Sequence, residues 1–206
     1  MNEKLLIPSI RFAGFTDAWE RRKLGELAEL GKGVGYSKAD IQSEGTPLIL
    51  YGRLYTKYQT IIREVDTYAA PKSGSVYSKG GEVIVPASGE TAEDISIASV
   101  VVKSGVMIGG DLNIVQPCQA LKPDFLAYSI SYGEPHFKLS KYAQGKSVVH
   151  IHNSDIQVVE IPFPKRQEQE SICRLFGALD RLITLHQRKL EKLQNIKKAC
   201  LEKMFV

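Results

Sequence analysis

The sequence predicts an α+β fold, in which a β-rich globular domain at residues 1–161 is followed by a single long C-terminal helix within residues 162–206. Two observations support this prediction. Short runs of β-favouring residues, separated by Gly, Ser, Pro and Asp, fill the middle of the chain. The last 42 residues instead place apolar side chains at alternating intervals of three and four, which is the spacing of a coiled-coil seam.

The expected helices and strands can be assigned in order along the chain. The only tryptophan, Trp19, lies near two phenylalanines and is expected to be a packing anchor. Residues 23–30 have helical spacing and predict two or three helical turns. The remaining expected elements are strands at 46–51, 82–86, 95–102, 112–116 and 158–161 and helices at 124–132 and 135–142. A Pro-Phe-Pro sequence at 162–164 then ends the sheet and begins the long helix.

The C-terminal helix carries a continuous seam. Eight of its ten seam positions are apolar, and His186 and Lys197 interrupt it. At 1.5 Å per residue the helix is about 60 Å long, too long to bury against one small domain, so it is expected to need a partner. The seam positions are Ile172, Phe176, Leu179, Ile183, His186, Leu190, Leu193, Lys197, Cys200 and Met204. The residues expected to carry dimerisation are Ile172, Phe176, Leu179, Ile183, Leu190 and Leu193.

Charge and composition narrow the class of protein. The net charge is +4, but residues 1–164 hold 17 basic and 18 acidic side chains, whereas residues 165–206 hold 10 and 5. The basic excess on the helix is either a solvated face or a contact with a polyanion. Three widely spaced cysteines without a CxxC pair suggest reduced thiols in a cytoplasmic protein. With no apolar run of 18 residues, no membrane span is expected.

Catalytic and metal motifs are weak. Residues 140–147 resemble a phosphate-binding loop but have Ser in place of its first glycine. His150, His152 and Asp155 could chelate a metal, but a further ligand at suitable spacing is not evident. No nucleophile elbow surrounds Ser88. We therefore expect a non-catalytic chain without a metal site or a cofactor of its own.

Nucleic-acid binding is the better-supported prediction. Residues 51–60 interleave aromatic, basic and hydroxyl side chains, and the loop at 144–150 offers small, basic and polar groups. Arginine can fork onto guanine, while lysine, threonine and tyrosine can hold phosphates. The expected DNA contacts are Tyr51, Arg53, Tyr55, Lys57, Tyr58, Lys146, Ser147 and His150, with Ser88 and Thr91 as weaker candidates.

Nearly the whole chain resembles the specificity (S) subunits of type I restriction-modification systems. The resemblance also includes the closing pattern of apolar residues on the C-terminal helix. The matching stretches are FAGFTDAWE at 12–20, KLGEL at 23–27, ILYGRLY at 49–55, PASGETAEDI at 86–95, GGDLN at 109–113, and residues 154–164.

This resemblance implies a function. In the family, target recognition domains each read one half of a split double-stranded DNA site, and long antiparallel helices act as a ruler between them. S subunits bind modification subunits, which methylate adenine with S-adenosylmethionine, and restriction subunits, which use ATP and Mg²⁺. One recognition domain at residues 1–161 and one helix within 162–206 resemble a half-size form, for which the seam predicts a homodimer.

Two other classes remain open on the sequence alone. The chain could be an interaction protein whose coiled coil docks a partner and whose domain binds protein rather than DNA. It could also be an enzyme whose site carries no recognisable motif. Absence of DNA binding in the assembled complex would favour the first, and activity of the purified chain on DNA would favour the second.

Overall fold

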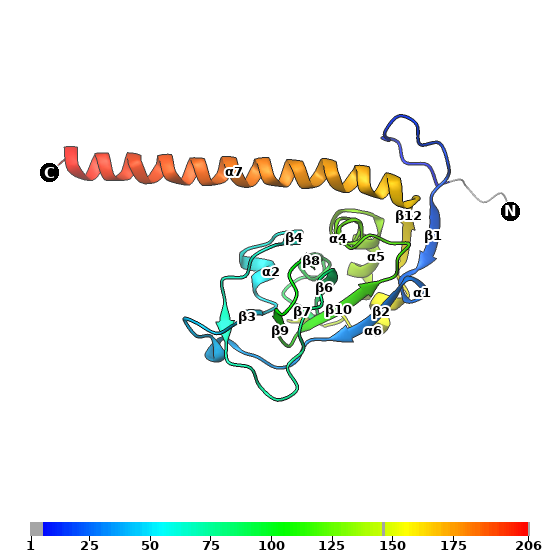
Figure 1. Ribbon diagram of the computed structural model, residues 1–206, viewed down its shortest axis with the longest axis horizontal. Helices are drawn as coiled ribbons and strands as arrows, with labels where there is room; N and C mark the ends of the chain where they lie inside the picture. The colour runs from blue at the N-terminus through cyan, green and yellow to red at the C-terminus, as the bar shows by residue number, and fades with distance from the viewer. Residues whose placement is uncertain (1–5, 146, 206) are drawn as a thin grey trace. The chain divides into compact units, whose positions relative to one another are not determined.

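The computed structural model describes residues 6–145 and 147–205 (Figure 1). The chain divides into two compact units, Met1–Glu170 and Ser171–Val206. The elements before the long helix are β1 (Glu20–Lys23), α1 (Leu24–Leu27), β2 (Ala28–Lys32), a 3-10 helix (Lys38–Asp40), β3 (Thr46–Ile49), α2 (Arg53–Thr56), β4 (Ile61–Ile62), β5 (Tyr68–Ala69), β6 (Glu82–Pro86), β7 (Ser88–Gly89), α3 (Ala92–Ile95), β8 (Ser99–Val101), β9 (Met107–Ile108), β10 (Leu112–Pro117), α4 (Pro123–Tyr132), α5 (Glu134–Tyr142), β11 (Val149–His150), α6 (Asn153–Gln157) and β12 (Glu160–Phe163). The long helix is α7 (Arg166–Met204).

A five-stranded sheet with the order β2-β10-β6-β8-β4 organises the first unit. Its pairs are antiparallel except for β4 and β8, which run parallel. Every residue of β6 is buried, because the strand lies between two neighbours and α4 packs against both β6 and β8 (Figure 1). This explains why its sequence, EVIVP, is an unbroken apolar run after one glutamate rather than an alternating pattern.

The core joins this sheet to a smaller one. In the smaller sheet β3 pairs antiparallel with β5 and parallel with β9, so β3 brings the start of α2 to the edge of the core. Two further ribbons are β1 with β12 and β7 with β11. The main cluster of buried apolar side chains is Ile49, Leu54, Ile62, Ile84, Val101, Val106, Ile108, Leu112 and Ile114.

The predicted helix at residues 23–30 is only half correct. Leu24 and Leu27 are buried on the one-turn helix α1, but the chain becomes extended at Ala28 and pairs with β10. A side chain at Gly33 would place its Cβ 1.9 Å from the Gly109 carbonyl oxygen. Gly33 therefore allows close backbone approach to Gly109, and the separate pairing of residues 28–32 with β10 overrides the helical spacing.

The other predicted elements agree closely with the structure. The strands expected at 82–86 and 112–116 correspond to β6 and β10, and the helices at 124–132 and 135–142 correspond to α4 and α5. The run at 95–102 is divided, since its start belongs to α3 and only its end forms β8. The last strand begins two residues later than expected. Trp19 packs edge-on against Phe125 with ring centroids 5.8 Å apart, as a packing anchor should.

The first turn of α7 belongs to the globular unit, which extends to Glu170 and so beyond the expected boundary at residue 161. The Glu168 carboxylate is 2% exposed and accepts hydrogen bonds from Nε and Nη2 of Arg11, both at 2.7 Å. Gln169 is fully buried, and its Nε2 donates to the carbonyl oxygens of Ala120 and Pro164 at 2.9 and 2.8 Å. Paired buried polar groups of this kind fix the position of the turn.

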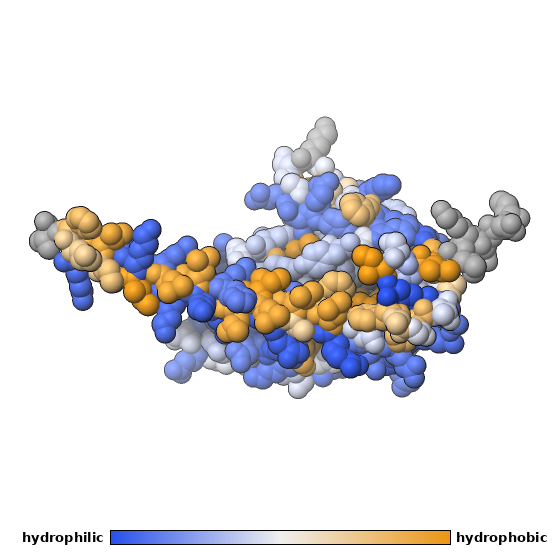
Figure 2. All heavy atoms as spheres, turned by 90° about the horizontal axis from the view of Figure 1, so that it is seen from above, coloured by the Kyte–Doolittle hydropathy of each residue, from blue (hydrophilic) through white to orange (hydrophobic). Residues whose placement is uncertain are grey.

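The second unit is the remainder of α7, a single unbroken helix (Figure 1). Apolar side chains run along it in a row (Figure 2). Five of the residues predicted to carry dimerisation are between 42 and 56% exposed, namely Phe176, Leu179, Ile183, Leu190 and Leu193. A search of the described residues finds no helix long and apolar enough to cross a membrane.

Candidate nucleic-acid interface

The predicted segment 51–60 is built around α2, a single helical turn that follows β3 directly. Leu54 is buried in the main core cluster and anchors this turn. The rings of Tyr51 and Tyr55 meet edge-to-face with centroids 6.2 Å apart and remain 40 and 37% exposed. The turn therefore presents two aromatic side chains side by side on the surface.

Arg53 points into the domain rather than towards solvent. Its side chain is 9% exposed. Nη1 donates to the Asp66 carboxylate at 2.6 Å, and Nη2 donates to Oε1 of Gln59 at 3.1 Å and to the carbonyl oxygen of Glu64 at 3.0 Å. In this arrangement the guanidinium holds the segment after α2 and does not offer its fork to a base.

Lys57 shares the same carboxylate. Its ammonium group is exposed and pairs with Asp66. The hydrogen bond from Lys57, followed by that from Arg53, lowers the pKa of Asp66 to about 2. Because Lys57 lies at the surface, its pairing with Asp66 is exchangeable for a phosphate at small cost.

Tyr58 is also turned inward. Its hydroxyl donates to the carbonyl oxygen of Ala98 at 3.0 Å and lies within hydrogen-bond distance of Oγ of Ser131, at 2.8 Å. Burial raises the pKa of the Tyr58 hydroxyl, so this group stays protonated and acts as a donor. Among the tyrosines of the segment, Tyr58 is held inside the domain by its hydrogen bonds, whereas Tyr51 and Tyr55 form the exposed pair.

Tyr55 connects the first predicted segment to β7. Its hydroxyl donates to the carbonyl oxygen of Ser88 at 2.7 Å, and burial, with a further contribution from Asp94, raises its pKa. A Cβ at Gly89 would lie 2.9 Å from the Tyr55 hydroxyl oxygen and 3.2 Å from Cβ of Ile95. Glycine is therefore required here for the tyrosine to reach the strand.

The strand β7 in turn brings in the second predicted segment. Gly89 pairs with Val149, and Ser88 pairs with His150. The backbones of Gln144 and His150 exchange two hydrogen bonds, of 3.1 and 2.8 Å, and close the intervening loop. The exposed rings of His150 and His152 lie parallel with centroids 6.4 Å apart. The two segments predicted to bind DNA thus meet across β7.

We name the area formed by Tyr51, Tyr55, Ser88–Gly89 and Val149–His150 the tyrosine–histidine surface. Ser147 is exposed on the adjoining loop, and the predicted contact Lys146 lies outside the described residues. The weaker candidates have local roles. Ser88 is buried, and the hydroxyl of Thr91 accepts from the Asp94 amide at 3.1 Å, which caps α3.

The sequence analysis did not select the carboxylates that border this surface. Asp94 and Asp111 both act on the Tyr55 hydroxyl electrostatically, and Glu90 is exposed directly after Gly89. Asp111 has a φ of +57°, the left-handed region that aspartate tolerates better than most residues. Their signal lay in the stretches SGETAED and GGD, which the sequence presents only as acidic loops.

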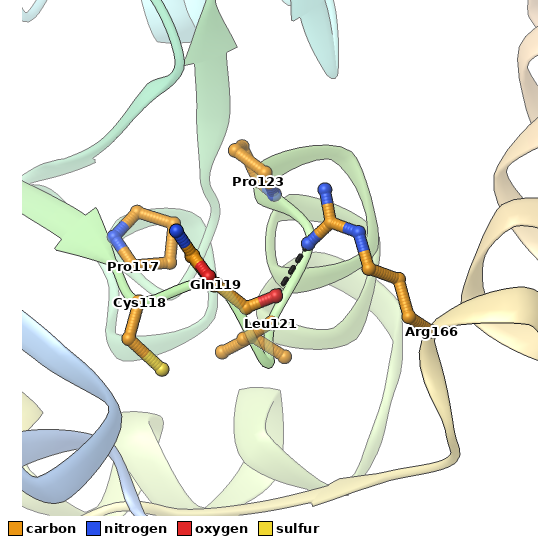
Figure 3. A pocket seen from close by; sticks show the side chains of 6 residues that line it. All are labelled: Pro117, Cys118, Gln119, Leu121, Pro123 and Arg166. Atoms are coloured by element: carbon orange, nitrogen blue, oxygen red, sulfur yellow. Dashed lines mark hydrogen bonds between the residues drawn. The ribbon is translucent and has the colours of Figure 1, made fainter.

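A separate cleft of about 470 Å³ lies beside the loop before α4 (Figure 3). Arg166 is the charged side chain among its lining residues, and its Nη1 donates to the carbonyl oxygen of Gln119 at 2.6 Å (Figure 3). The cleft shares no lining residue with the tyrosine–histidine surface. Across residues 6–145 and 147–205, no three His, Cys, Asp or Glu side chains gather where they could hold a metal ion.

A family model for the type I restriction modification DNA specificity domain matches residues 16–195. The chain belongs to this family. The type I restriction enzyme MjaVIII specificity subunit of Methanocaldococcus jannaschii is 22% identical over 190 residues, which cover 91% of this chain and 42% of that protein.

Two solved structures show the same fold. The S subunit of a type I restriction-modification system from M. genitalium has a TM-score of 0.69 at 16% identity and covers 97% of this chain and 49% of its own. The HsdS subunit from Thermoanaerobacter tengcongensis has a TM-score of 0.58 at 19% identity and covers 98% and 47%. The chain thus spans about half the length of these specificity subunits, and the α+β prediction with a long C-terminal helix is confirmed.

Proposed function

We propose that this specificity-family chain reads one half of a bipartite double-stranded DNA site. It would direct adenine-N6 methylation and restriction, which partner subunits carry out, and it would pair with a second copy through α7. The observation that carries the DNA-reading part is the tyrosine–histidine surface, where two segments selected from sequence as DNA contacts meet across β7. Family membership supports the wider role.

Within this surface we assign base contact to the exposed rings of Tyr51, Tyr55 and His150. Imidazole nitrogens can donate to or accept from base edges in a groove, and tyrosine rings pack against base methyl groups and sugars. The carboxylates of Asp94 and Asp111 stand near Tyr55 and would repel a phosphate. The negative charge of these two carboxylates therefore favours contact with bases rather than with the phosphate backbone near Tyr55.

We assign phosphate contact to Lys57, Lys146 and Ser147. Lys57 and Ser147 are exposed, and Lys146 is assigned from sequence alone. Such contacts position a protein on DNA without specifying sequence. Arg53 and Tyr58 would contribute indirectly, because their hydrogen bonds inside the domain fix the segment that carries Tyr55.

The pairing of two copies is supported by the row of apolar side chains along α7 (Figure 2). Leaving so many half-exposed aliphatic residues in water is unfavourable, at about 25 cal/mol for each Å². We place S-adenosylmethionine, ATP and Mg²⁺ in the partner modification and restriction subunits and assign no reaction step to this chain.

A methylation map tests the proposal. The chain is co-expressed with its modification subunit in a host lacking adenine methylation, and N6-methyladenine is located by genome sequencing. A single interrupted palindrome is expected, because two identical half-sites would be read by a symmetric pair. An asymmetric split motif would show that a second, different recognition domain takes part. No modification by a soluble complex would refute the proposal and favour the protein-docking alternative.

Matched variants test whether the methylated motif depends on the tyrosine–histidine surface. Tyr51→Ala with His150→Ala should abolish the methylated motif, whereas Tyr77→Ala should leave it intact. Tyr77 is 43% exposed, close to the value for Tyr51, but it lies at a strand bridge to Met107 outside the tyrosine–histidine surface. Equal loss in both variants would mean that the effect comes from stability rather than recognition.

A further inference from the structure

A buried polar side chain interrupts the apolar run of β10. Asn113 lies between Leu112 and Ile114, two members of the main core cluster, and is only 1% exposed. Successive side chains of a strand point to opposite faces of the sheet, so Asn113 faces away from that cluster. A buried amide is unfavourable unless its hydrogen bonds are satisfied. Its partners therefore explain why an asparagine occupies this position.

The amide of Asn113 joins two carbonyl groups from distant parts of the chain. Its Nδ2 donates to the carbonyl oxygen of Ile151 at 2.9 Å and to that of Pro86 at 3.5 Å. All three residues are buried. An asparagine amide supplies two N–H donors without a charge, whereas an aspartate of the same shape, once ionised, only accepts. Asn113 thus connects the end of β6 to the residue that follows β11.

The loop from Gln144 to His150 needs such a connection. The backbones of these two residues exchange two hydrogen bonds, which fix the shape of the loop but not its place on the domain. Ile151 follows the loop directly, is fully buried, and has both backbone groups engaged. Its N–H donates to the carbonyl oxygen of Ala87 at 3.0 Å, and its carbonyl oxygen accepts from Asn113. Ile151 is therefore an anchor between the loop and the domain.

Strand pairing alone is too short to hold the loop. β7 and β11 contribute two residues each, and a ribbon of that length is marginal without further support. One peptide bond joins His150 to Ile151, so the hydrogen bonds of Ile151 also fix the backbone that carries the imidazole. They keep His150 opposite Ser88, whose carbonyl oxygen accepts from the Tyr55 hydroxyl.

We propose that Asn113 is a positioning residue of the tyrosine–histidine surface: by holding the Ile151 carbonyl, it places the His150 imidazole for contact with a base. Asn113 is buried and acts through Ile151 rather than by touching DNA. The inference rests on the proposed reading of DNA at this surface. It adds a residue from outside both segments that the sequence analysis selected.

DNA binding tests the inference with a matched control variant. Asn153 is the control, because its Nδ2 also donates to a backbone carbonyl, that of Gly31 at 2.9 Å, but attaches α6 to β2 instead of the loop to β7. Affinity for the methylated motif is measured with the full chain assembled with its modification subunit. Asn113→Ala should weaken this binding by about tenfold or more, whereas Asn153→Ala should leave it unchanged. In a His150→Ala background, Asn113→Ala should cause a much smaller loss, because the ring that it positions is absent.

The His150 ring supplies a second readout, which a loss of stability alone would not change. The chain has four histidines, and the NMR signal that is missing from His150→Ala identifies the ring protons of His150. This signal should shift in Asn113→Ala and keep its position in Asn153→Ala. If Asn113→Ala does not fold, Asn113→Ser, in which one hydroxyl replaces the two N–H donors, is measured in the same way with the same expectation.

The possible failures are distinguishable. Full cognate binding by His150→Ala would refute base contact by His150, and both the proposed function of this ring and the role of Asn113 would fall. Impaired binding by His150→Ala, together with normal binding or an unmoved His150 signal in Asn113→Ala, would overturn the positioning role alone. An equal loss from Asn113→Ala in both backgrounds would assign Asn113 to general stability and would also overturn that role.

Discussion

Replacing Arg53 by alanine distinguishes a guanine-reading role from the internal clamp in the structure. The substitution removes hydrogen bonds to Gln59, the Glu64 carbonyl and Asp66. The first two should contribute about 1 kcal/mol each, and the bond to the exposed carboxylate less than about 1 kcal/mol. We therefore expect Arg53→Ala to lower the free energy of unfolding by about 2–3 kcal/mol.

The assay combines urea unfolding with DNA binding by the assembled complex. The clamp predicts a loss of stability together with weaker binding to cognate DNA, because the segment that carries Tyr55 and Lys57 loosens. Asp66→Asn should give a smaller loss, and the double variant should show non-additivity between the two positions. An unchanged unfolding free energy with a selective loss of about 1–3 kcal/mol at the cognate site would refute the clamp and establish base reading by Arg53.

Three further predictions follow from single contacts. Gly89→Ala should displace the Tyr55 hydroxyl and weaken cognate DNA binding at least tenfold, whereas Gly52→Ala, with open space around its Cβ, should not; equal binding by both variants would contradict this. Leu190→Ala should weaken helix pairing by about 2–5 kcal/mol in sedimentation experiments, and an unchanged dimer would place the interface elsewhere. Because the pKa of Asp66 is held at about 2, its contribution should be complete above pH 3.8 and lost as the pH falls towards 2; an Asp66→Asn variant with the same acid unfolding curve would contradict this.

The elements that the sequence predicted well are those whose signal is local. The apolar runs of β6 and β10 and the helix α4 agree with the structure to within a residue or two, because their burial follows from their own composition. The helix expected at 23–30 failed where a long-range partner decided the outcome. Ala28 and its successors pair with β10, and no local pattern reveals that strand as their neighbour.

In the candidate site, too, local signals in the sequence predicted one part and long-range contacts decided the other. The sequence selected residue types able to contact DNA in segments 51–60 and 144–150, but it did not distinguish among the residues chosen there. Tertiary contacts distinguish these side chains. Tyr58 contacts Ser131 and Arg53 pairs with Asp66, so both side chains form their hydrogen bonds within the domain rather than with DNA. Leu54 anchors the turn in the main core cluster, while Tyr51 and Tyr55 keep partly exposed rings.

By itself, the sequence determined that a β-rich domain precedes one long helix with a coiled-coil seam, since period and composition are properties of neighbouring residues. Only the tertiary structure decided that the two predicted DNA-binding segments lie together. That juxtaposition depends on the pairing of β7 with β11 and on the Tyr55 hydroxyl reaching Ser88. Both are hydrogen bonds between groups 33 or more positions apart in the chain, and the absence of a Cβ at Gly89 leaves room for them.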